Sequence, residues 1–400
     1  VGKESHHVEG VLLHHLGKTA EILFFLMGAM TIVEIIDYFD GFSTIKTFIK
    51  TKSKTRLLWL FTTLAFVLSA IIDNLTATIV LITILQKIIK DKELRLWFAG
   101  LIVIAANAGG AWSPIGDVTT TMLWIANKVT PASLIAHVLL PSIACYALPS
   151  LIASRMKIFK GQIDSDLTEE PTASKYSATM FYLGLAGILF VPIFKTLTHL
   201  PPYVGMMLSL AIVSAVAEFL SNKQFSVAAA TSGHGVHEPQ HSPVHKSLSK
   251  IEMPSILFFL GILMAVAALE SLGMLYEFAG VLEKGVPMLG TEHGTTTLSD
   301  LVVLLLGAGS AVIDNVPLVA ASIGMFSMQL DAPEWHFIAY SAGTGGSILV
   351  IGSAAGVVAM GMEKIDFFWY LKKIGGLALL GFLAGGAVFI ILRDFLLNSN

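Results

Sequence analysis

Two long apolar stretches of this 400-residue chain, 57–89 and 298–330, are each broken near the middle by an Asp-Asn pair, at Asp73-Asn74 and Asp314-Asn315. An ionisable residue inside a stretch long enough to enter a membrane is energetically costly. Hydrophobic residues make up 54% of the chain and charged residues only 13%, about half the charged fraction of soluble domains. The chain is therefore predicted to be an all-α, polytopic membrane protein with polar breaks inside its membrane segments.

The stretch 57–89 is predicted to form a re-entrant helical hairpin. Each arm beside the Asp-Asn pair holds about sixteen residues, or roughly 24 Å of helix, which is marginal for a full crossing. Lysine and arginine flank both ends of the stretch, and basic residues in short loops mark the cytoplasmic side. Both ends are therefore expected in the cytoplasm, with the Asp-Asn pair at the hairpin tip, at membrane depth.

The stretch 298–330 is predicted to form a second hairpin. Its surroundings are acidic, with Glu283 and Glu292 before it and Asp331 and Glu334 after it. The charge rule then puts both of its ends outside. The two hairpins are therefore expected to enter the membrane from opposite faces.

Each hairpin is followed by an apolar segment that glycines interrupt. The segment 97–127 contains the run Asn107–Asp117, and the segment 335–363 contains the run Ser341–Ser347. Glycine and proline inside a membrane helix predict local unwinding, which is tolerated where the freed backbone lines a cavity or a site. The predicted backbone breaks are Gly109, Gly110, Pro114, Gly345 and Gly346.

The order helix, hairpin, broken helix, helix occurs twice with opposite predicted orientation, which is the inverted-topology repeat of secondary transporters. The second repeat opens with two helices that have no counterpart upstream of residue 20, so two further helices are expected before Val1 in the native protein. The predicted parts are the first repeat (1–160), a linker (161–174) and the second repeat (175–400), which begins with the helix pair (175–220) and a cytoplasmic, histidine-rich loop (221–250).

Four segments carry a resemblance to a known family: Met27–Asp37, Ser69–Thr76, Asn107–Thr120 and Ser310–Pro317. They resemble the NhaD-type sodium/proton antiporters of the ion-transporter superfamily, which also includes dicarboxylate and arsenite carriers. The resemblance covers nearly the whole chain, and the third segment is the most specific. It implies exchange of Na+ or Li+ for protons, and a division into a mobile transport part and a dimer-forming scaffold.

The ionisable groups inside the predicted membrane segments are carboxylates with no buried lysine or arginine facing them. Such a carboxylate must bind a metal cation or take up a proton, because burial disfavours the bare charge. Na+ and H+ then compete for one group, which is the simplest mechanism of antiport. Hard cations prefer carboxylate, amide, hydroxyl and carbonyl oxygens. The residues predicted to bind Na+ and H+ are Asp73, Asn74, Asn107, Asp117, Thr119, Thr120, Asp314 and Asn315.

The two halves differ at one position, because Ser353 stands where the first half has Asp117. The first half is therefore expected to dominate ion binding, with Asp314 adding charge or carrying a second proton. An accessory role is assigned to a further set of polar residues: Glu34, Asp37, Ser69, Thr76, Glu270, Ser341, Thr344, Ser347 and Ser353.

These groups also have structural interpretations. Asp and Asn cap helices by accepting from free backbone N–H groups, so the Asp-Asn pairs are suited to capping the half-helices of each hairpin. Asp117 is likewise suited to capping a helix that starts at Val118. Glu34 and Asp37, near the end of their helix, are interfacial on this interpretation.

Histidines of the loop 221–250 lack cysteine or acidic co-ligands at a fixed spacing, so no transition-metal site is predicted. Because histidine titrates near neutrality, a pH-sensing loop is a separate hypothesis. The histidines concerned are His234, His237, His241 and His245.

No cofactor is predicted beyond the transported Na+, Li+ and H+. Membrane lipid and a second copy of the chain, bound through the scaffold helices, are the expected partners. The net charge of −3 and the absence of a basic patch give no indication of nucleic-acid binding. The predicted location is the bacterial inner membrane, with an organellar envelope as the alternative.

Four other functions are considered. A sodium-coupled dicarboxylate symporter or an arsenite-type exporter of the same fold needs donors at the hairpin tips, where this chain has two aspartates. An intramembrane aspartyl protease would use a Gly-x-Gly-Asp motif, but Pro114 occupies the first glycine position. An enzyme is therefore not expected. A passive channel is disfavoured by inverted broken helices, which are typical of alternating access.

Overall fold

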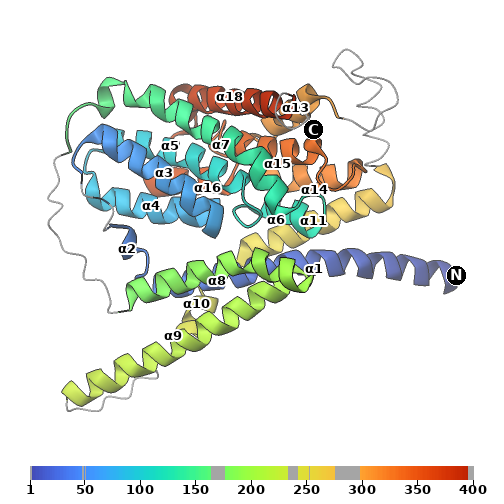
Figure 1. The fold of residues 1–400 in the computed structure, drawn as a ribbon, viewed down its shortest axis with the longest axis horizontal. Coiled ribbons are helices and arrows are strands. Elements are labelled where there is room, and N and C mark those ends of the chain that lie inside the picture. Colours follow the sequence, from blue (N-terminus) through green and yellow to red (C-terminus); the bar gives the residue numbers. More distant parts are fainter. Residues whose placement is uncertain are drawn as a thin grey trace. The chain divides into compact units, whose positions relative to one another are not determined.

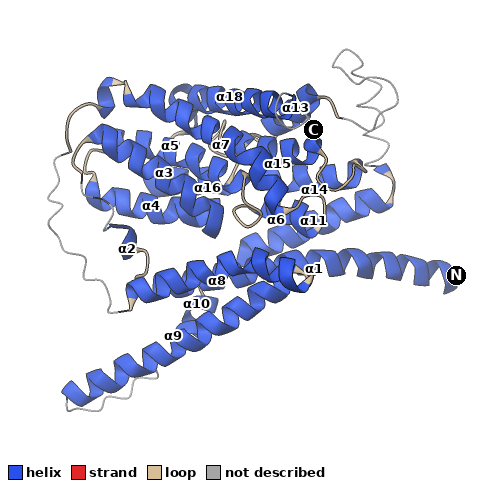
Figure 2. Ribbon diagram, in the orientation of Figure 1, coloured by secondary structure: helices blue, strands red, loops and turns tan. Residues whose placement is uncertain are grey.

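The computed structural model describes residues 2–46, 49, 51–163, 176–232, 242–251, 253–274 and 298–394. Across these residues the regular secondary structure is helical (Figure 2), and an isolated β-bridge joins Ser53 to Gln162. The chain is an all-α, multi-pass membrane protein, as predicted. Seven of the described helical segments are long and apolar enough to cross a membrane: Leu13–Tyr38, Lys54–Ile72, Lys92–Ala111, Pro131–Ser154, Ser177–Thr198, Pro202–Ser221 and Phe367–Leu392.

The chain packs into two compact units. Unit 1 contains both predicted hairpins and both predicted broken helices. Unit 2 contains most of the first helix and the helices of the central region. Unit 1 is Val1–Leu16, Thr51–Leu167 and Gly261–Asn400, and unit 2 is Gly17–Lys50 and Thr168–Leu260.

In the first half of unit 1, the hairpin consists of two helices that pack against each other (Figure 1). A single residue, Asp73, separates them. The broken segment that follows is two helices with an unwound stretch between them. The elements are α3 (Lys54–Ile72), α4 (Asn74–Ile88), α5 (Lys92–Ala111), α6 (Val118–Ile125), α7 (Pro131–Ser154) and the 3₁₀ turn η1 (Lys157–Phe159).

The second half of unit 1 has the same order of elements. Two short helices form the hairpin, and two more flank an unwound stretch. A π-helical turn joins the last two helices. The elements are α13 (Asp300–Gly309), α14 (Asn315–Met325), α15 (Pro333–Gly345), α16 (Ala354–Glu363), α17 (Phe367–Tyr370), η3 (Leu371–Gly375) and α18 (Gly376–Leu392).

Helix α5 lies at the centre of unit 1. Of the residues in its apolar stretch, 89% are buried. The helix packs against α3, α4, α7, α15 and α16. The carboxylate of Asp91 fixes its start by accepting from the backbone N–H groups of Glu93 and Leu94, which satisfies donors that lack an intrahelical partner. Helices of both halves therefore contact α5. A polar group near the C-terminal end of α5 can thus meet side chains of both halves.

Unit 2 is built from long apolar helices. Helices α8 and α9 pack together, and α10 packs on α9. Helices α1 and α11 each contribute residues to both units. The elements are α1 (Gly2–Tyr38), α2 (Ser43–Lys46), α8 (Ser177–Thr198), α9 (Pro202–Ser232), α10 (Pro243–Leu248) and α11 (Met253–Ser271).

The prediction of a loop at 221–250 is wrong in part. Helix α9 continues to Ser232, and α10 is also helical. The reason is local: residues 221–232 contain neither glycine nor proline and include three consecutive alanines, Ala228–Ala230, so no residue there stops the helix. The first helix is also longer than predicted, starting at Gly2 rather than near residue 20. His234, His237 and His241 lie outside the described residues.

Candidate functional site

The two hairpin tips meet at one carboxylate, that of Asp117. Asn74, the first residue of α4, donates from Nδ2 to Asp117 Oδ2 over 2.9 Å. Asn315, the first residue of α14, donates from Nδ2 to the same oxygen over 3.3 Å. Asp117 is 4% exposed. The two Asp-Asn signatures therefore converge on a single buried acid through their asparagines.

The other oxygen of Asp117 caps helix α6. Asp117 Oδ1 accepts from the backbone N–H of Thr119 and from its hydroxyl, each over 2.9 Å. The capping interpretation and the binding interpretation of Asp117 therefore describe different oxygens of one carboxylate. One oxygen is fixed by its own helix, and the other faces the hairpin tips.

A chain of side-chain hydrogen bonds crosses from the first half to the second. Asn74 Nδ2 also donates to Asn107 Oδ1 over 3.0 Å, and Asn107 Nδ2 donates to Ser353 Oγ over 2.9 Å. Ser353 in turn caps α16 by accepting from the N–H of Gly356 over 3.2 Å. All three side chains are buried, so the polar groups of the site satisfy one another.

No lysine, arginine or histidine pairs with Asp117 in the part of the chain that the structure describes. Its hydrogen-bond partners are amides, a hydroxyl and a backbone N–H. A buried carboxylate that lacks a cation is stable only when neutral or when a cation binds. This arrangement is suited to a site that accepts a positive charge from outside the protein.

One contact to the backbone around the site is repeated in the two halves, although Ser310 Oγ also lies 2.8 Å from the carbonyl of Gly307. Ser69 Oγ donates to the carbonyl of Ala106 over 2.5 Å, and Ser310 Oγ donates to the carbonyl of Ala342 over 3.0 Å. In both halves a hydroxyl of the hairpin thus holds the last turns of the helix before the break. Sequence reasoning omitted Ser310 from the candidates, although it stands at the matching position of the second signature.

Two glycines allow these helices to touch backbone to backbone. A Cβ at Gly109 would overlap the carbonyl group of Phe66, and a Cβ at Gly345 would overlap that of Gly307. Small residues at helix crossings permit such approach inside membranes. Gly109, Gly110 and Gly345 lie inside α5 and α15 and not in the unwound stretches, so their prediction as backbone breaks is wrong. Gly109 and Gly345 instead serve close packing of helix on hairpin.

Threonine hydroxyl groups donate to backbone carbonyls around the first break. Thr120 Oγ1 donates to the carbonyl of Asp117 over 3.0 Å and lies 3.5 Å from that of Gly110. Thr121 Oγ1 donates to the carbonyl of Pro114 over 2.9 Å. Thr120, a predicted ligand, therefore bonds to backbone, whereas Thr119 bonds to the Asp117 carboxylate.

The two tip aspartates lie outside the hydrogen-bonded network around Asp117. Asp73 caps α4, accepting from the N–H and the hydroxyl of Thr76 over 2.8 and 2.9 Å. Its backbone has φ 79° and ψ 159°, a region that is essentially glycine-only and costs about 1–3 kcal/mol. Asp314 has φ −43° and makes no capping bond to α14.

The accessory residues are scattered. Thr344 and Ser347 donate to carbonyls of their own segment, Tyr340 and Thr344 respectively, and Ser341 is buried without a hydrogen-bond partner among the described residues. Glu270 is exposed.

Glu34 and Asp37 lie in unit 2 and face Lys250, whose Nζ lies 3.8 Å and 3.4 Å from their carboxylates. Lys250 is itself exposed, with 49% of its side chain accessible, so this contact is with a surface base and does not contradict the prediction that no buried base faces these carboxylates. Lys250 is far away in sequence, at the end of the predicted loop, and only the fold brings it to α1.

Comparison with known proteins gives a consistent assignment. The model of the citrate transporter family matches residues 12–345. Sodium/proton antiporter 1 of Arabidopsis thaliana is 42% identical over 96% of this chain, which spans 64% of that relative, and sodium/proton antiporter 2 of the same plant is 38% identical, covering 96% and 88%. The Na+/H+ antiporter NhaD of Vibrio cholerae is 33% identical, covering 90% and 76%. The chain therefore belongs to the citrate transporter family and, within it, to the NhaD type of antiporter.

Proposed function

We propose that this chain is a secondary active antiporter that exchanges Na+, and also Li+, for H+ across a membrane. The observation that carries the proposal is the buried carboxylate of Asp117, which has no lysine, arginine or histidine partner among the described residues and to which the asparagines of both hairpin tips donate. The names of the relatives support the same ions.

The chemistry of the site suits a hard cation. Oxygen ligands are available from Asp117, from the hydroxyl of Thr119 and from the amides of Asn74, Asn107 and Asn315. Rotating a side-chain amide replaces its nitrogen by its oxygen, so an asparagine that donates to a bare or protonated acid can coordinate Na+ when the ion is bound. A proton and Na+ each neutralise Asp117, so binding one favours release of the other.

Alternating access through inverted repeats is part of this proposal. Both hairpins bond to the same oxygen of Asp117, so the charge state of that oxygen acts on both halves at once. Asp73 and Asp314 beside the tips add negative charge, with Asp314 a candidate for a second proton. The proposal describes a carrier without enzymatic chemistry and without a cofactor.

An anionic substrate is less compatible with the site, although the family is named for citrate transport. A carboxylate ligand needs free donors or cations, whereas the tip amides already donate to Asp117. A carboxylate placed here would also face the charge of Asp117. We therefore favour cation exchange over dicarboxylate symport or arsenite export.

The test is proton movement in everted membrane vesicles. We expect NaCl and LiCl, added at several pH values, to release protons from energised vesicles that contain the protein, and KCl to serve as the comparison. Vesicles with Asp117→Asn should show no response above vesicles without the protein. Uptake of labelled citrate or succinate, without cation-driven proton movement, would overturn the proposal.

We further propose that the protein forms a homodimer through α8 and α9 of unit 2, in contact with lipid. These helices present exposed apolar side chains, among them Phe190, Ile193, Leu208 and Phe219, and large exposed apolar surfaces indicate lipid or protein contact. Native mass spectrometry from detergent should detect the dimer. The proposed location is a bacterial inner membrane, with an organellar envelope as the alternative because two relatives are from a plant.

A further inference from the structure

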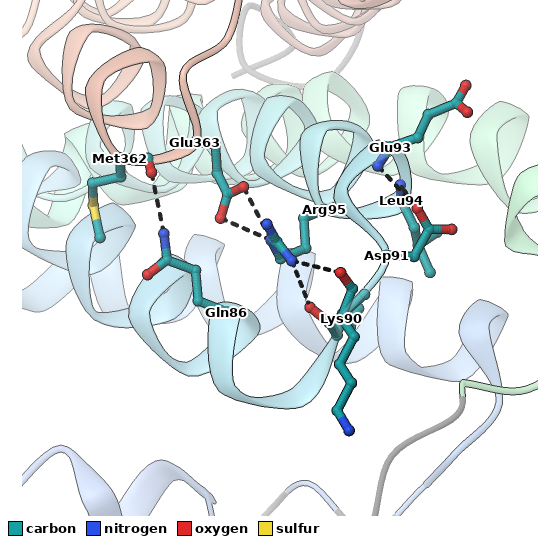
Figure 3. Close-up of polar contacts among 9 residues, drawn as sticks. Gln86, Lys90, Asp91, Glu93, Leu94, Arg95, Met362 and Glu363 are labelled. Atoms are coloured by element: carbon teal, nitrogen blue, oxygen red, sulfur yellow. Dashed lines mark hydrogen bonds and ion pairs between the residues drawn. The ribbon is translucent and has the colours of Figure 1, made fainter.

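Three helix ends of unit 1 meet at an ion pair that lies away from Asp117. Arg95, in the first turn of α5, donates from Nε to both carboxylate oxygens of Glu363, the last residue of α16, over 3.2 and 3.1 Å (Figure 3). The Glu363 side chain is 1% exposed and that of Arg95 is 20% exposed. The pair joins residues 268 positions apart in the sequence.

Arg95 also holds the end of the first hairpin. Its Nη1 donates to the carbonyls of Ile89 and Lys90, over 3.0 and 2.9 Å, just past the last turn of α4. One turn earlier, Gln86 Nε2 donates to the carbonyl of Met362 over 3.2 Å. Figure 3 shows the guanidinium between these carbonyls and the carboxylate of Glu363. One side chain therefore connects α4, α5 and α16.

Neither charge is favoured by its own helix. The N-terminus of a helix carries partial positive charge and the C-terminus partial negative charge, yet Arg95 lies at the start of α5 and Glu363 at the end of α16. Arg95 instead complements the C-terminal carbonyls of α4. A buried charge left without its partner is strongly destabilising. The two residues are therefore explained by each other and by α4, and not by local helix chemistry.

The same three helices carry the first hydrogen-bond chain of the site. Asn74 begins α4, Asn107 lies near the end of α5, and Ser353 caps α16. Arg95 and Asn107 are twelve residues apart, or about 18 Å along α5. The helices are thus tied at one end by Arg95 and Glu363 and at the other by the chain from Asn74 to Ser353.

We propose that Arg95 and Glu363 are positioning residues for ion binding: they hold α16 against α4 and α5, and so keep Ser353 and Asn107 in register with the Asp117 carboxylate. The proposal rests on the proposed exchange at Asp117. It differs from a purely stabilising role, because it requires the apparent affinity for Na+ of folded protein to change when the pair is broken.

The test uses the full chain in proteoliposomes, with the Na+ dependence of proton movement and hydrogen exchange of the α16 amides as two separate readouts. Arg95→Met and Glu363→Gln should each raise the Na+ concentration for half-maximal exchange about tenfold, with a smaller effect on the maximal rate, and should speed amide exchange in α16. Arg95→Lys should recover part of the affinity, since an ammonium keeps the charge but not the planar arrangement of donors. The reversed pair, Arg95→Glu with Glu363→Arg, should recover less, because a glutamate cannot donate to the α4 carbonyls.

Lys90→Gln and Glu93→Gln are the matched controls. Both side chains are exposed and lie beside the pair (Figure 3), so each variant removes one charge without touching it, and both should behave as the unaltered protein. Should Arg95→Met fail to fold, Arg95→Lys and Glu363→Gln carry the test.

The outcomes separate this proposal from the proposed function. If the unaltered protein moves no protons with Na+, the proposed function fails, and amide exchange in α16 still decides whether the pair holds that helix. Unchanged half-maximal Na+ in folded Arg95→Lys and Glu363→Gln protein would overturn the positioning role. Unchanged amide exchange in α16 would overturn it as well.

Discussion

The two halves of unit 1 share a framework and differ in charge. Ser69 and Ser310 make the same bond to the helix before the break, and Asp117 and Ser353 both cap the helix after it. Only the first half, however, supplies a carboxylate at this position. Two ionised acids that share one buried site repel each other. The repeat thus supplies the geometry twice, whereas the charge that a cation or proton must neutralise is supplied once.

The hairpin tips show a related difference. Asp73 stands in a strained backbone conformation with φ 79° and is held by Thr76. Asp314 has ordinary negative φ and no capping bond. The asparagines that follow both aspartates reach the same oxygen of Asp117. The tip that belongs to the acidic half is therefore the more tightly specified of the two.

The two halves also differ in charge at the start of each broken segment, away from the break. Matching Asp117 with Ser353 also matches Arg95 with Asp331. Arg95 pairs with a carboxylate, whereas Asp331 accepts from the N–H and hydroxyl of Thr130, over 2.6 and 2.8 Å. Equivalent positions thus join the two halves at both ends of the site, through an ion pair at one and neutral donors at the other.

Separate substitution of the two capping residues, Asp117 and Ser353, is the strongest test of the difference between the halves. Asp117→Asn removes the only carboxylate in the hydrogen-bonded network around the tip asparagines, so Na+-driven proton movement in everted vesicles should fall about a hundredfold or more. Ser353→Ala loses a hydroxyl. It should retain measurable exchange, with a raised Na+ concentration for half-maximal exchange. Equal loss in the two variants would contradict the unequal roles of the halves.

The shared framework predicts equal effects at the two glycines. Gly109→Ala and Gly345→Ala each force a methyl group into a backbone carbonyl, and overpacking of this kind costs about 1–3 kcal/mol. Both should lower the midpoint of thermal unfolding in detergent by similar amounts. Gly361→Ala in α16 is the control, because nothing lies within 4 Å of the added Cβ and alanine is the better helix former. A large drop in only one half would show that the framework is not shared.

The asparagines of the two tips should differ by degree. Asn74 donates to Asn107 and Asp117, at 3.0 and 2.9 Å, whereas the Asn315 amide donates to Asp117, at 3.3 Å, and to no second side chain among the described residues. Asn74→Ala should therefore raise the Na+ concentration for half-maximal exchange about tenfold or more, since a hydrogen bond to a charged group is worth about 1.5–3 kcal/mol. Asn315→Ala should have a smaller effect in the same titration. The reverse order would indicate that the second hairpin controls the site.

The smallest effect on Na+ dependence is expected at the contact between Thr130 and Asp331, where the donors to the carboxylate are uncharged. Thr130→Val keeps the backbone N–H bond to Asp331 but removes the hydroxyl bond to Asp331 and the capping bond that the hydroxyl accepts from the N–H of Ser133 at the start of α7. Unfolding should therefore become easier by about 2 kcal/mol, with the Na+ concentration for half-maximal exchange unchanged. Thr83→Val, which removes a hydroxyl bond inside its own helix, is the matched control. A shift in Na+ dependence as large as that of Arg95→Met would show that the Thr130–Asp331 contact and the Arg95–Glu363 pair have equivalent roles.

Much of the arrangement was predictable from patterns along the chain. Apolar stretches interrupted by Asp-Asn or by glycines predicted both hairpins and both broken helices, because a polar break in an apolar helix needs a partner inside the protein. The same reasoning picked out Asn74, Asn107, Asp117, Thr119 and Asn315, which the fold brings together. It gave Asp73 and Asp314 equal standing with them, although neither joins that network.

The sequence by itself determined the class of protein, the two segments that contain a break and the identity of the acid that only one half carries, although the helices continue further into each predicted break, to Ala111 and Gly345. These depend on composition and on short-range chemistry, such as the glycines and the capping side chains. The tertiary structure decided which oxygen of Asp117 faces the tips, that Lys250 faces Glu34 and Asp37, and that Arg95 reaches Glu363. Contacts between residues far apart in the sequence, up to 268 positions here, depend on how helices cross, and no local pattern of residues specifies that.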